Sequence, residues 1–235
     1  MSYVGFSNLP NQVHRRMVKK GFEFTLMLVG ESGLGKSTLC ASLFDIEKES
    51  YRQSHQTEQI GQTVKITKTD LNITEENGVR LKLTVVDTPG FGGSLDISEQ
   101  QEPISRFIDQ QFEAYFDQET GINRKNIIDT RVHCCFYFIS PHSNGLRPMD
   151  VEFMKKVHHK VNIVPLLAKA DTLTDQEIAY KKARILQDIK TYNIRIYTLP
   201  DGEEEINQNS SVEERRYKNE LEVLKKAMPF AVVGS

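Results

Sequence analysis

A glycine-rich segment carries the strongest chemical signal in the sequence. Residues 30–37 (GESGLGKS) fit the pattern GxxxxGK[ST], in which backbone N–H groups surround phosphate oxygens. Lys36 is expected to neutralise the β- and γ-phosphates, and the Ser37 hydroxyl is expected to take a Mg²⁺ position. The pattern predicts a nucleoside triphosphate site, whose other contacts from this segment are expected to be Gly30, Ser32, Gly33, Gly35 and Thr38.

Two later segments supply the remaining groups of such a site. Residues 87–90 (DTPG) end an apolar stretch, and we expect Asp87 to hold Mg²⁺ through water and the Gly90 N–H to sense the γ-phosphate. Residues 168–171 (AKAD) follow another apolar stretch. The Asp171 carboxylate can accept both the ring N–H and the exocyclic amine of guanine, while the Lys169 stem covers the base. Adenine offers no such donor pair, so these motifs indicate GTP or GDP with Mg²⁺.

Two residues bear on the rate of hydrolysis at such a site. Efficient small GTPases place a glutamine directly after the DxxG glycine to orient water, but this sequence has Phe91 there. Thr63 is either an ordinary strand residue or a switch threonine that closes on Mg²⁺ and the γ-phosphate. We therefore expect slow hydrolysis, with Thr63, Lys36 and Gly90 acting at the γ-phosphate. The alternatives are a nucleotide-loaded scaffold without useful catalysis, a member of another large GTPase family, and an ATP-using P-loop enzyme.

The elements that must position these residues alternate between strand and helix. This alternation predicts an α/β fold with a mostly parallel sheet, one antiparallel strand and helices on both faces, and the motifs above make it a P-loop GTPase fold. An Asn-Gly turn at residues 77–78 predicts the hairpin that introduces the antiparallel strand. Predicted strands cover residues 22–29, 63–73, 79–86, 132–139, 161–168 and 194–199, with another beginning at 231; predicted helices cover residues 36–44, 97–116, 149–159, 174–192 and 212–228.

Composition limits the class of protein. The 235 residues are 38% hydrophobic and 26% charged, which is globular, and the net charge of −2 gives no general attraction to nucleic acid. No apolar run approaches the roughly 20 residues of a membrane-spanning helix, so we expect a cytoplasmic protein. We expect Cys40, Cys134 and Cys135 to be buried and reduced.

Several longer stretches resemble septins. They span nearly the whole chain and include YVGFSNLPNQVHRRMVKKGFEFTLMLVGESGLGKSTL, DTPGFG, ETGINRKNIIDTRVHCCFYFISP, GLRPMDVEFMKKVHHKVNIVPLLAKADTLT and PFAVVGS. The resemblance implies a cytoskeletal GTP-binding subunit that assembles with other septin subunits into hetero-oligomeric filaments. It also implies that the isolated chain forms a homodimer through its nucleotide-side interface.

The resemblance adds roles for single residues. Thr63 falls at the switch threonine of the septins that hydrolyse GTP. Glu177 matches a position near the partner's nucleotide, although a capping box with Thr174 explains it equally well. Gly234 falls where septins offer backbone to the base. Asn144 departs from the family, which often has a histidine at that position, and Gly93 departs where the family usually has an aspartate.

The two ends of the chain also gain meaning from the resemblance. A basic segment, residues 1–20, precedes the GTP-binding domain of residues 21–235, and its Arg15, Arg16, Lys19 and Lys20 would share one side of a helix. Such a face suits anionic phospholipids such as phosphoinositides at the inner face of the plasma membrane; a solvated helix face is the alternative. Septins continue past AVVGS through a tryptophan-glycine element, and this sequence has no tryptophan, so we expect a C-terminally truncated domain.

Overall fold

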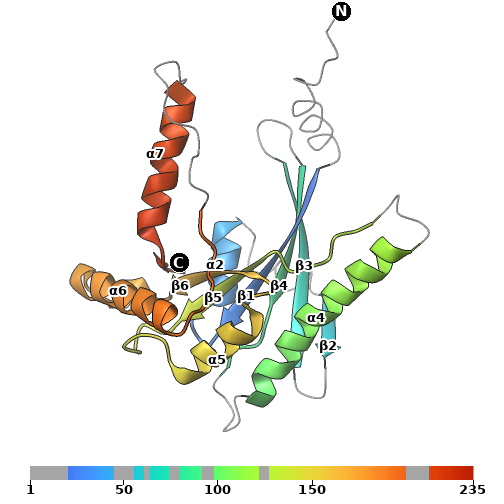
Figure 1. Ribbon diagram of the computed structural model, residues 1–235, viewed down its shortest axis with the longest axis horizontal. Coiled ribbons are helices and arrows are strands. Elements are labelled where there is room, and N and C mark those ends of the chain that lie inside the picture. The colour runs from blue at the N-terminus through green and yellow to red at the C-terminus, as the bar shows by residue number, and fades with distance from the viewer. Residues whose placement is uncertain are drawn as a thin grey trace, which may run out of the picture.

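A seven-stranded sheet forms the centre of the molecule in a computed structural model that describes residues 21–44, 56–60, 64–74, 80–91, 98–121, 127–199 and 212–234 (Figure 1). The strand order is β2-β3-β4-β1-β5-β6-β7. Antiparallel pairing occurs only between β3 and its neighbours β2 and β4 among the described strands, and the other pairings are parallel. The prediction of one antiparallel strand in a mostly parallel sheet is confirmed. The strands are β1 (Phe22–Gly30), β2 (Gln56–Ile60), β3 (Val64–Thr74), β4 (Arg80–Asp87), β5 (Cys134–Ile139), β6 (Asn162–Leu167) and β7 (Phe230–Ala231).

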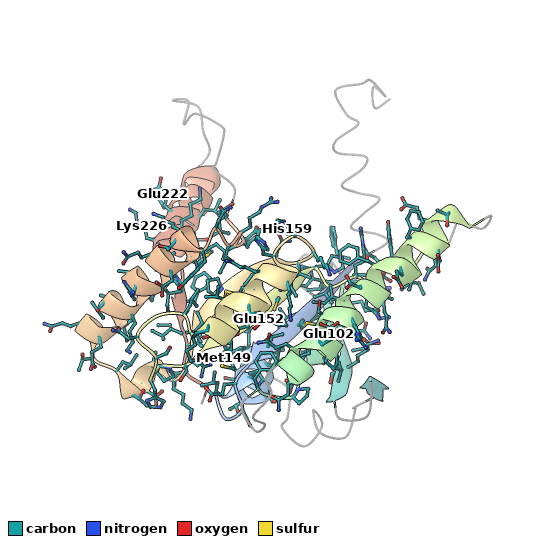
Figure 2. The ribbon with its side chains drawn as sticks, turned by 60° about the horizontal axis from the view of Figure 1, so that its bottom comes forward. Glu102, Met149, Glu152, His159, Glu222 and Lys226 are labelled. Atoms are coloured by element: carbon teal, nitrogen blue, oxygen red, sulfur yellow. The ribbon has the colours of Figure 1, made fainter. Side chains whose placement is uncertain are left out.

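Helices cover both faces of this sheet, as predicted. Three of them, α4, α5 and α6, lie over one face, onto which Figure 2 looks, and α2 lies over the other. The helices are α2 (Lys36–Leu43), α4 (Ser98–Thr120), α5 (Pro148–Val157), α6 (Asp175–Thr191) and α7 (Val212–Ala227), with a short 3₁₀ turn, η3, at Ala170–Thr172. Within the described ranges, no helix is both long enough and apolar enough to cross a bilayer.

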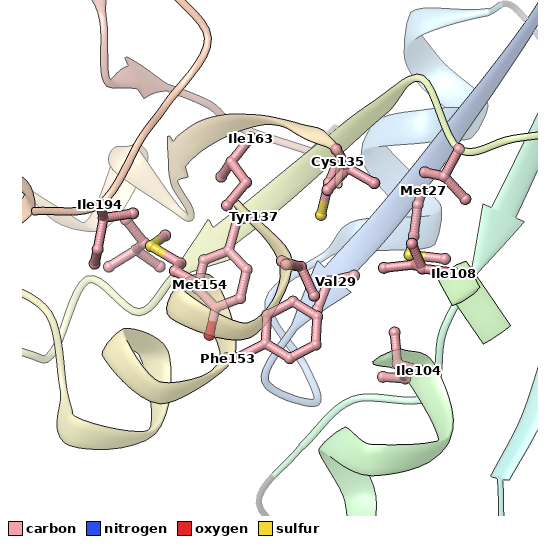
Figure 3. Close-up of a cluster of buried hydrophobic side chains, with 14 of the residues drawn as sticks. Met27, Val29, Ile104, Ile108, Cys135, Tyr137, Phe153, Met154, Ile163 and Ile194 are labelled. Atoms are coloured by element: carbon pink, nitrogen blue, oxygen red, sulfur yellow. The ribbon is translucent and has the colours of Figure 1, made fainter. Parts of the chain in front are cut away.

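The strand that leads into the phosphate-binding segment is buried on both faces. Met27 and Val29 of β1 point to the core beneath α4, α5 and α6, whereas Leu26 and Leu28 point to the core beneath α2. Successive side chains of a strand point to opposite faces, so an apolar run such as LMLV fits only a central strand. The first core also holds Tyr137 and other large side chains (Figure 3). Packing on both faces therefore fixes the position of the end of β1, from which the phosphate-binding segment starts.

Two strand assignments from the sequence need correction. Residues 194–199 were predicted to form a strand, but they form no ladder: Tyr197 N donates to Ile163 O, and Arg195 N donates instead to His158 Nδ1. The last two residues of β6, Leu166 and Leu167, pair instead with the two residues of β7. In the other direction, β2 was not predicted, because its sequence, QTEQI, is polar and lacks the alternation that marks a half-buried strand.

Candidate nucleotide-binding site

The predicted phosphate-binding loop joins the buried strand β1 to the N-terminus of α2. Gly35 is the N-cap of α2 and has φ 83°, a left-handed conformation that glycine adopts without steric cost. This conformation lets the chain turn sharply into the helix, so that the free N–H groups of the first helical turn face the loop. A helix N-terminus of this kind favours a bound anion.

Lys36 lies at the base of the loop. Its side chain is 7% exposed, and Nζ donates to Gly30 O at 3.2 Å and Glu31 O at 3.0 Å. Burial lowers the pKa of Lys36 below its ordinary value, and the negative charges of Asp87 and Glu31 oppose that shift. The ammonium group is thus held against the loop backbone, at the place where a phosphate of a bound nucleotide would need a cation.

Ser37 and Asp87 meet at the mouth of the loop. The Ser37 hydroxyl donates to Asp87 Oδ2, although fifty residues separate the two in the chain. A hydroxyl and a carboxylate are the hard oxygen donors that Mg²⁺ prefers, so this pair fits part of a magnesium site. A cavity of about 370 Å³ opens here; it is lined by Ser32, Gly33, Gly35, Lys36, Ser37, Thr38, Asp87, Thr88, Pro89 and Gly90.

The backbone after Asp87 docks directly on the phosphate-binding loop. Phe91 N donates to Gly30 O at 3.2 Å, and Ser32 N donates to Phe91 O at 3.0 Å. Gly90 approaches the loop so closely that a Cβ at this position would overlap the backbone of Ser32. The Phe91 ring is 1% exposed and packs against Phe153, with 5.6 Å between ring centroids. Phe91 is therefore a core residue that fastens this segment to the loop.

The predicted base-recognition segment begins where β6 ends. Lys169 has φ 49°, and Asp171 is exposed in η3. Ala168 replaces the asparagine usual in this motif, but the turn is fastened in other ways: Thr172 Oγ1 donates to Lys169 O at 2.8 Å, and Ala170 N donates to Val232 O at 3.1 Å.

The C-terminal strand brings Gly234 to the same place. Val232 N donates to Leu167 O at 2.9 Å, which lays the residues after β7 beside the end of β6. A Cβ on Gly234 would lie 3.4 Å from Thr38 Cβ at the start of α2. The structure thus brings Gly234 and the base-recognition segment to the same end of the sheet as the phosphate-binding loop.

A second cavity of about 410 Å³ also borders the loop. Its lining residues come from the loop, from residues 140–147 and from the base-recognition segment: Glu31, Ser32, Gly33, Leu34, Ser140, His142, Ser143, Arg147 and Lys169. Sequence reasoning missed Arg147, whose guanidinium donates to Glu31 Oε2 at 2.8 Å. No sequence signal marks a pair that is separated by 116 positions.

Glu177 occupies the capping box expected at the start of α6. Its carboxylate accepts from Thr174 N at 2.8 Å and from Thr174 Oγ1 at 2.9 Å, and these bonds lower the pKa of Glu177. Four basic residues and two switch positions lie outside the described residues: Arg15, Arg16, Lys19, Lys20, Thr63 and Gly93.

Comparison with known proteins decides the family. A family model for septins matches residues 20–235. The chain belongs to the septin family. It is 56% identical to human Septin-4 over 235 residues, which cover 99% of this chain and 47% of that protein. It is also 56% identical to Septin-1 of Drosophila melanogaster, of which it covers 63%.

The fold comparison agrees with this assignment. The crystal structure of Cdc11 from Saccharomyces cerevisiae superposes with a TM-score of 0.62 at 33% identity, covering 91% of this chain and 80% of that one. The chain spans about half the length of Septin-4 and somewhat more of Septin-1.

Proposed function

We propose that this septin binds GTP and GDP at the carboxyl ends of its central strands. One observation carries the proposal: three motifs scattered from residue 30 to residue 171 converge on one end of the sheet. In this assignment the loop N–H groups and Lys36 bind the phosphates, the Gly90 N–H meets the γ-phosphate, and Asp171 selects guanine. Open α/β sheets bind ligands at this end of their strands.

Magnesium belongs to the same proposal. Ser37 and Asp87 would hold the ion, with Thr63 as a further ligand, and the ion would neutralise charge on the β- and γ-phosphates. Ser37 Oγ and Asp87 Oδ2 are hydrogen-bonded to each other, which supports their assignment to one site. Lys36 would supply the fixed positive charge beneath them.

Hydrolysis is proposed to be slow. The Phe91 side chain lies in the core and carries no polar group, so the position that orients water in fast small GTPases cannot do so here. Thr63 is then the remaining residue proposed to act on the γ-phosphate through its closure on Mg²⁺. The competing proposal is a nucleotide-loaded scaffold, and the buried Phe91 is the observation that favours it.

The identity of the bound nucleotide tests the binding proposal. Chromatography of the supernatant after denaturing the purified protein should give guanine nucleotide in an amount close to that of the protein. Binding of a fluorescent GDP should resist a large excess of ATP, because Asp171 finds no matching donors on adenine. Release of adenine nucleotide, or strong competition by ATP, would contradict the assignment of Asp171.

A single-turnover assay separates a slow GTPase from a scaffold. Phosphate release from bound GTP should persist in the wild type and fall at least about tenfold in Thr63→Ala. The affinity for fluorescent GDP serves as the control, because GDP lacks the γ-phosphate and should bind both proteins similarly. Equal phosphate release from both proteins would remove the catalytic role of Thr63.

Assembly is proposed to use the face that carries the nucleotide. The second cavity opens on that face beside His142, Arg147 and Lys169, and a partner subunit could fill it. We propose that the protein works as a cytoskeletal subunit, pairing with other septin subunits in filaments and with itself when isolated. Glu177 would then reach toward the partner's nucleotide while keeping its capping-box bonds.

Membrane attachment is the last part of the proposal. Arg15, Arg16, Lys19 and Lys20 would bind anionic head groups at the inner face of the plasma membrane. Replacing all four with glutamate should abolish cosedimentation with phosphoinositide vesicles at low salt, while vesicles of neutral lipid give the background. Unchanged cosedimentation would assign these residues to a solvated helix face.

A further inference from the structure

Arg147 connects the phosphate-binding loop to α5. Its Nη1 donates to Glu31 Oε2 at 2.8 Å, while its Nε and Nη2 donate to the Asp150 carboxylate at 3.1 and 3.3 Å. Arg147 is the N-cap residue of α5, so the loop is bound to the beginning of a helix that packs in the core. The guanidinium therefore bridges two carboxylates that belong to different elements.

The anchor behind Arg147 is buried and has several hydrogen bonds. Asp150 is 1% exposed and accepts from Tyr137 Oη at 2.8 Å and from Arg147 N at 2.9 Å. The Tyr137 ring, which comes from β5, stacks on Phe153 with 5.7 Å between centroids (Figure 3). Because Asp150 is fixed in this way, the guanidinium has a defined position before it meets Glu31.

Glu31 is the acidic side chain of the phosphate-binding loop, residues 30–37. Its backbone carbonyl accepts from Lys36 Nζ, and its backbone pairs with Phe91. The Glu31 charge reaches Lys36, because it raises the pKa of that residue against the effect of burial. A polyphosphate bound beside Lys36 would be repelled by the same negative charge.

We propose that Arg147 is a positioning residue for phosphate binding: it holds the Glu31 carboxylate against the start of α5 and offsets its charge, so that the loop can accept a polyanion. This inference rests on the proposed binding of guanine nucleotide. A purely structural role would require only the contact with Asp150, whereas the proposed role requires the contact with Glu31. The two roles therefore differ in what happens when Glu31 is neutral.

A double-mutant cycle tests the proposal by titrating fluorescent GDP and a non-hydrolysable GTP analogue. Arg147→Met should weaken binding of the triphosphate by about tenfold, the size expected for one uncompensated like charge near the phosphates, and binding of GDP by less. Arg147→Met combined with Glu31→Gln should return to within about twofold of the wild type. The deficit of Arg147→Met should also shrink at high salt, because ions screen the repulsion.

Glu31→Gln alone is the decisive variant if Arg147→Met does not fold, because it leaves Asp150 with its partners. It should bind the triphosphate at least as tightly as the wild type. Arg106→Met and Glu102→Gln form a matched control on α4, where the same residue types pair at 3.2 Å on an exposed surface; neither should alter binding.

Two results would overturn the proposal: a double variant as weak as Arg147→Met, or a Glu31→Gln variant weaker than the wild type. Failure of the wild type to bind guanine nucleotide at all would instead refute the proposed function on which the inference rests.

Discussion

Gly90 lies where the segment after Asp87 closely approaches the phosphate-binding loop. A Cβ at this position would overlap the backbone of Ser32, so neither segment could keep its place. We predict that Gly90→Ala lowers the affinity for fluorescent GDP more than about tenfold and destabilises the fold by about 1–3 kcal/mol, as overpacked sites do. Titration and urea unfolding measure the two effects.

Gly121→Ala is the matched control for this substitution. Gly121 follows α4, and a Cβ there would come no closer than 3.3 Å to the Asp117 carbonyl. We expect the free energy of unfolding of this variant to change by less than about 0.5 kcal/mol, and its nucleotide affinity to stay unchanged. Wild-type nucleotide affinity in Gly90→Ala would mean that the close approach has no part in binding.

The residues of the phosphate-binding loop could be predicted because their chemistry is local. Glycine at positions 33 and 35, lysine at 36 and serine at 37 follow one another along the chain, and a short pattern describes them. The Arg147–Glu31 pair could not be predicted, because it depends on how β5 and α5 bring residue 147 to the loop. Phe91 was predicted only as a side chain unable to orient water, and its burial against Phe153 depends on the tertiary fold.

At the scale of single elements, Glu177 has a structural role in the capping box of α6 and a proposed role in assembly. Substitutions in the capping box can distinguish these two roles. Thr174 Oγ1 accepts from Glu177 N at 3.3 Å and so satisfies one of the unpaired N–H groups of the first helical turn. We predict that Thr174→Ala destabilises the protein by about 1 kcal/mol in urea unfolding, without changing self-association.

The control for the capping box comes from the same helix. Thr191→Ala, at the last residue of α6, should cost less than about 0.5 kcal/mol. Glu177→Gln should weaken self-association in sedimentation experiments, because Glu177 is proposed to reach the partner. If Thr174→Ala weakened self-association as much as Glu177→Gln, loss of the capping box alone would explain the effect of both substitutions.

The segment that leads into β5 gives stability that depends on pH. Arg131 donates to both carboxylate oxygens of Asp129, at 2.9 and 2.7 Å, and this lowers the pKa of Asp129 from 3.8 to about 2. A lowered pKa means that the ionised carboxylate favours the folded state above about pH 3.8, and that this stabilisation disappears as pH falls through about 2.

The lowered pKa of Asp129 predicts how the effect of replacing this residue depends on pH. Asp129→Asn should lower the urea midpoint at pH 6, and the difference from the wild type should close as pH falls toward 2. In an Arg131→Met background the same substitution should have little further effect, because the main partner of the carboxylate is gone. A difference that stays constant with pH would show that the charge of Asp129 is not the cause.

Element types were largely predictable from periodicity, and the exceptions have physical reasons. The apolar run in β1 and the alternation in β3 and β4 identified those strands. Residues 194–199 have a strand-like composition but do not form a ladder with β6. The carboxyl end of β6 pairs with β7, and among these described residues only Tyr197 N donates to a β6 carbonyl, that of Ile163. The strand β2 depends on pairing with β3 and not on its own polar sequence.

At the scale of the whole molecule, self-association should depend on the face beside the phosphate-binding loop. We predict a dimer in sedimentation velocity with GDP or GTP present, and we predict that His142→Glu weakens it at least about tenfold. His142 lines the second cavity on this face, and a new negative charge there would have to be desolvated on docking.

His159→Glu is the matched control for the dimer experiment. His159 is exposed just after α5, at the end of that helix opposite to Met149 and Arg147 (Figure 2). The same change of charge there should leave the dimer intact. A protein that stays monomeric at high concentration with nucleotide present, or equal weakening by both variants, would contradict association through the nucleotide face.

The close approach of Gly234 to Thr38 has a consequence for the order of events during synthesis. Thr38 and Gly234 are almost 200 positions apart in the chain, yet they lie close together beside the proposed pocket for the base. A growing chain emerges from the ribosome N-terminus first, so the phosphate-binding loop exists long before residues 232–234 are made. Tight capture of guanine nucleotide would therefore wait until residues 232–234 have been translated and have reached the end of β6.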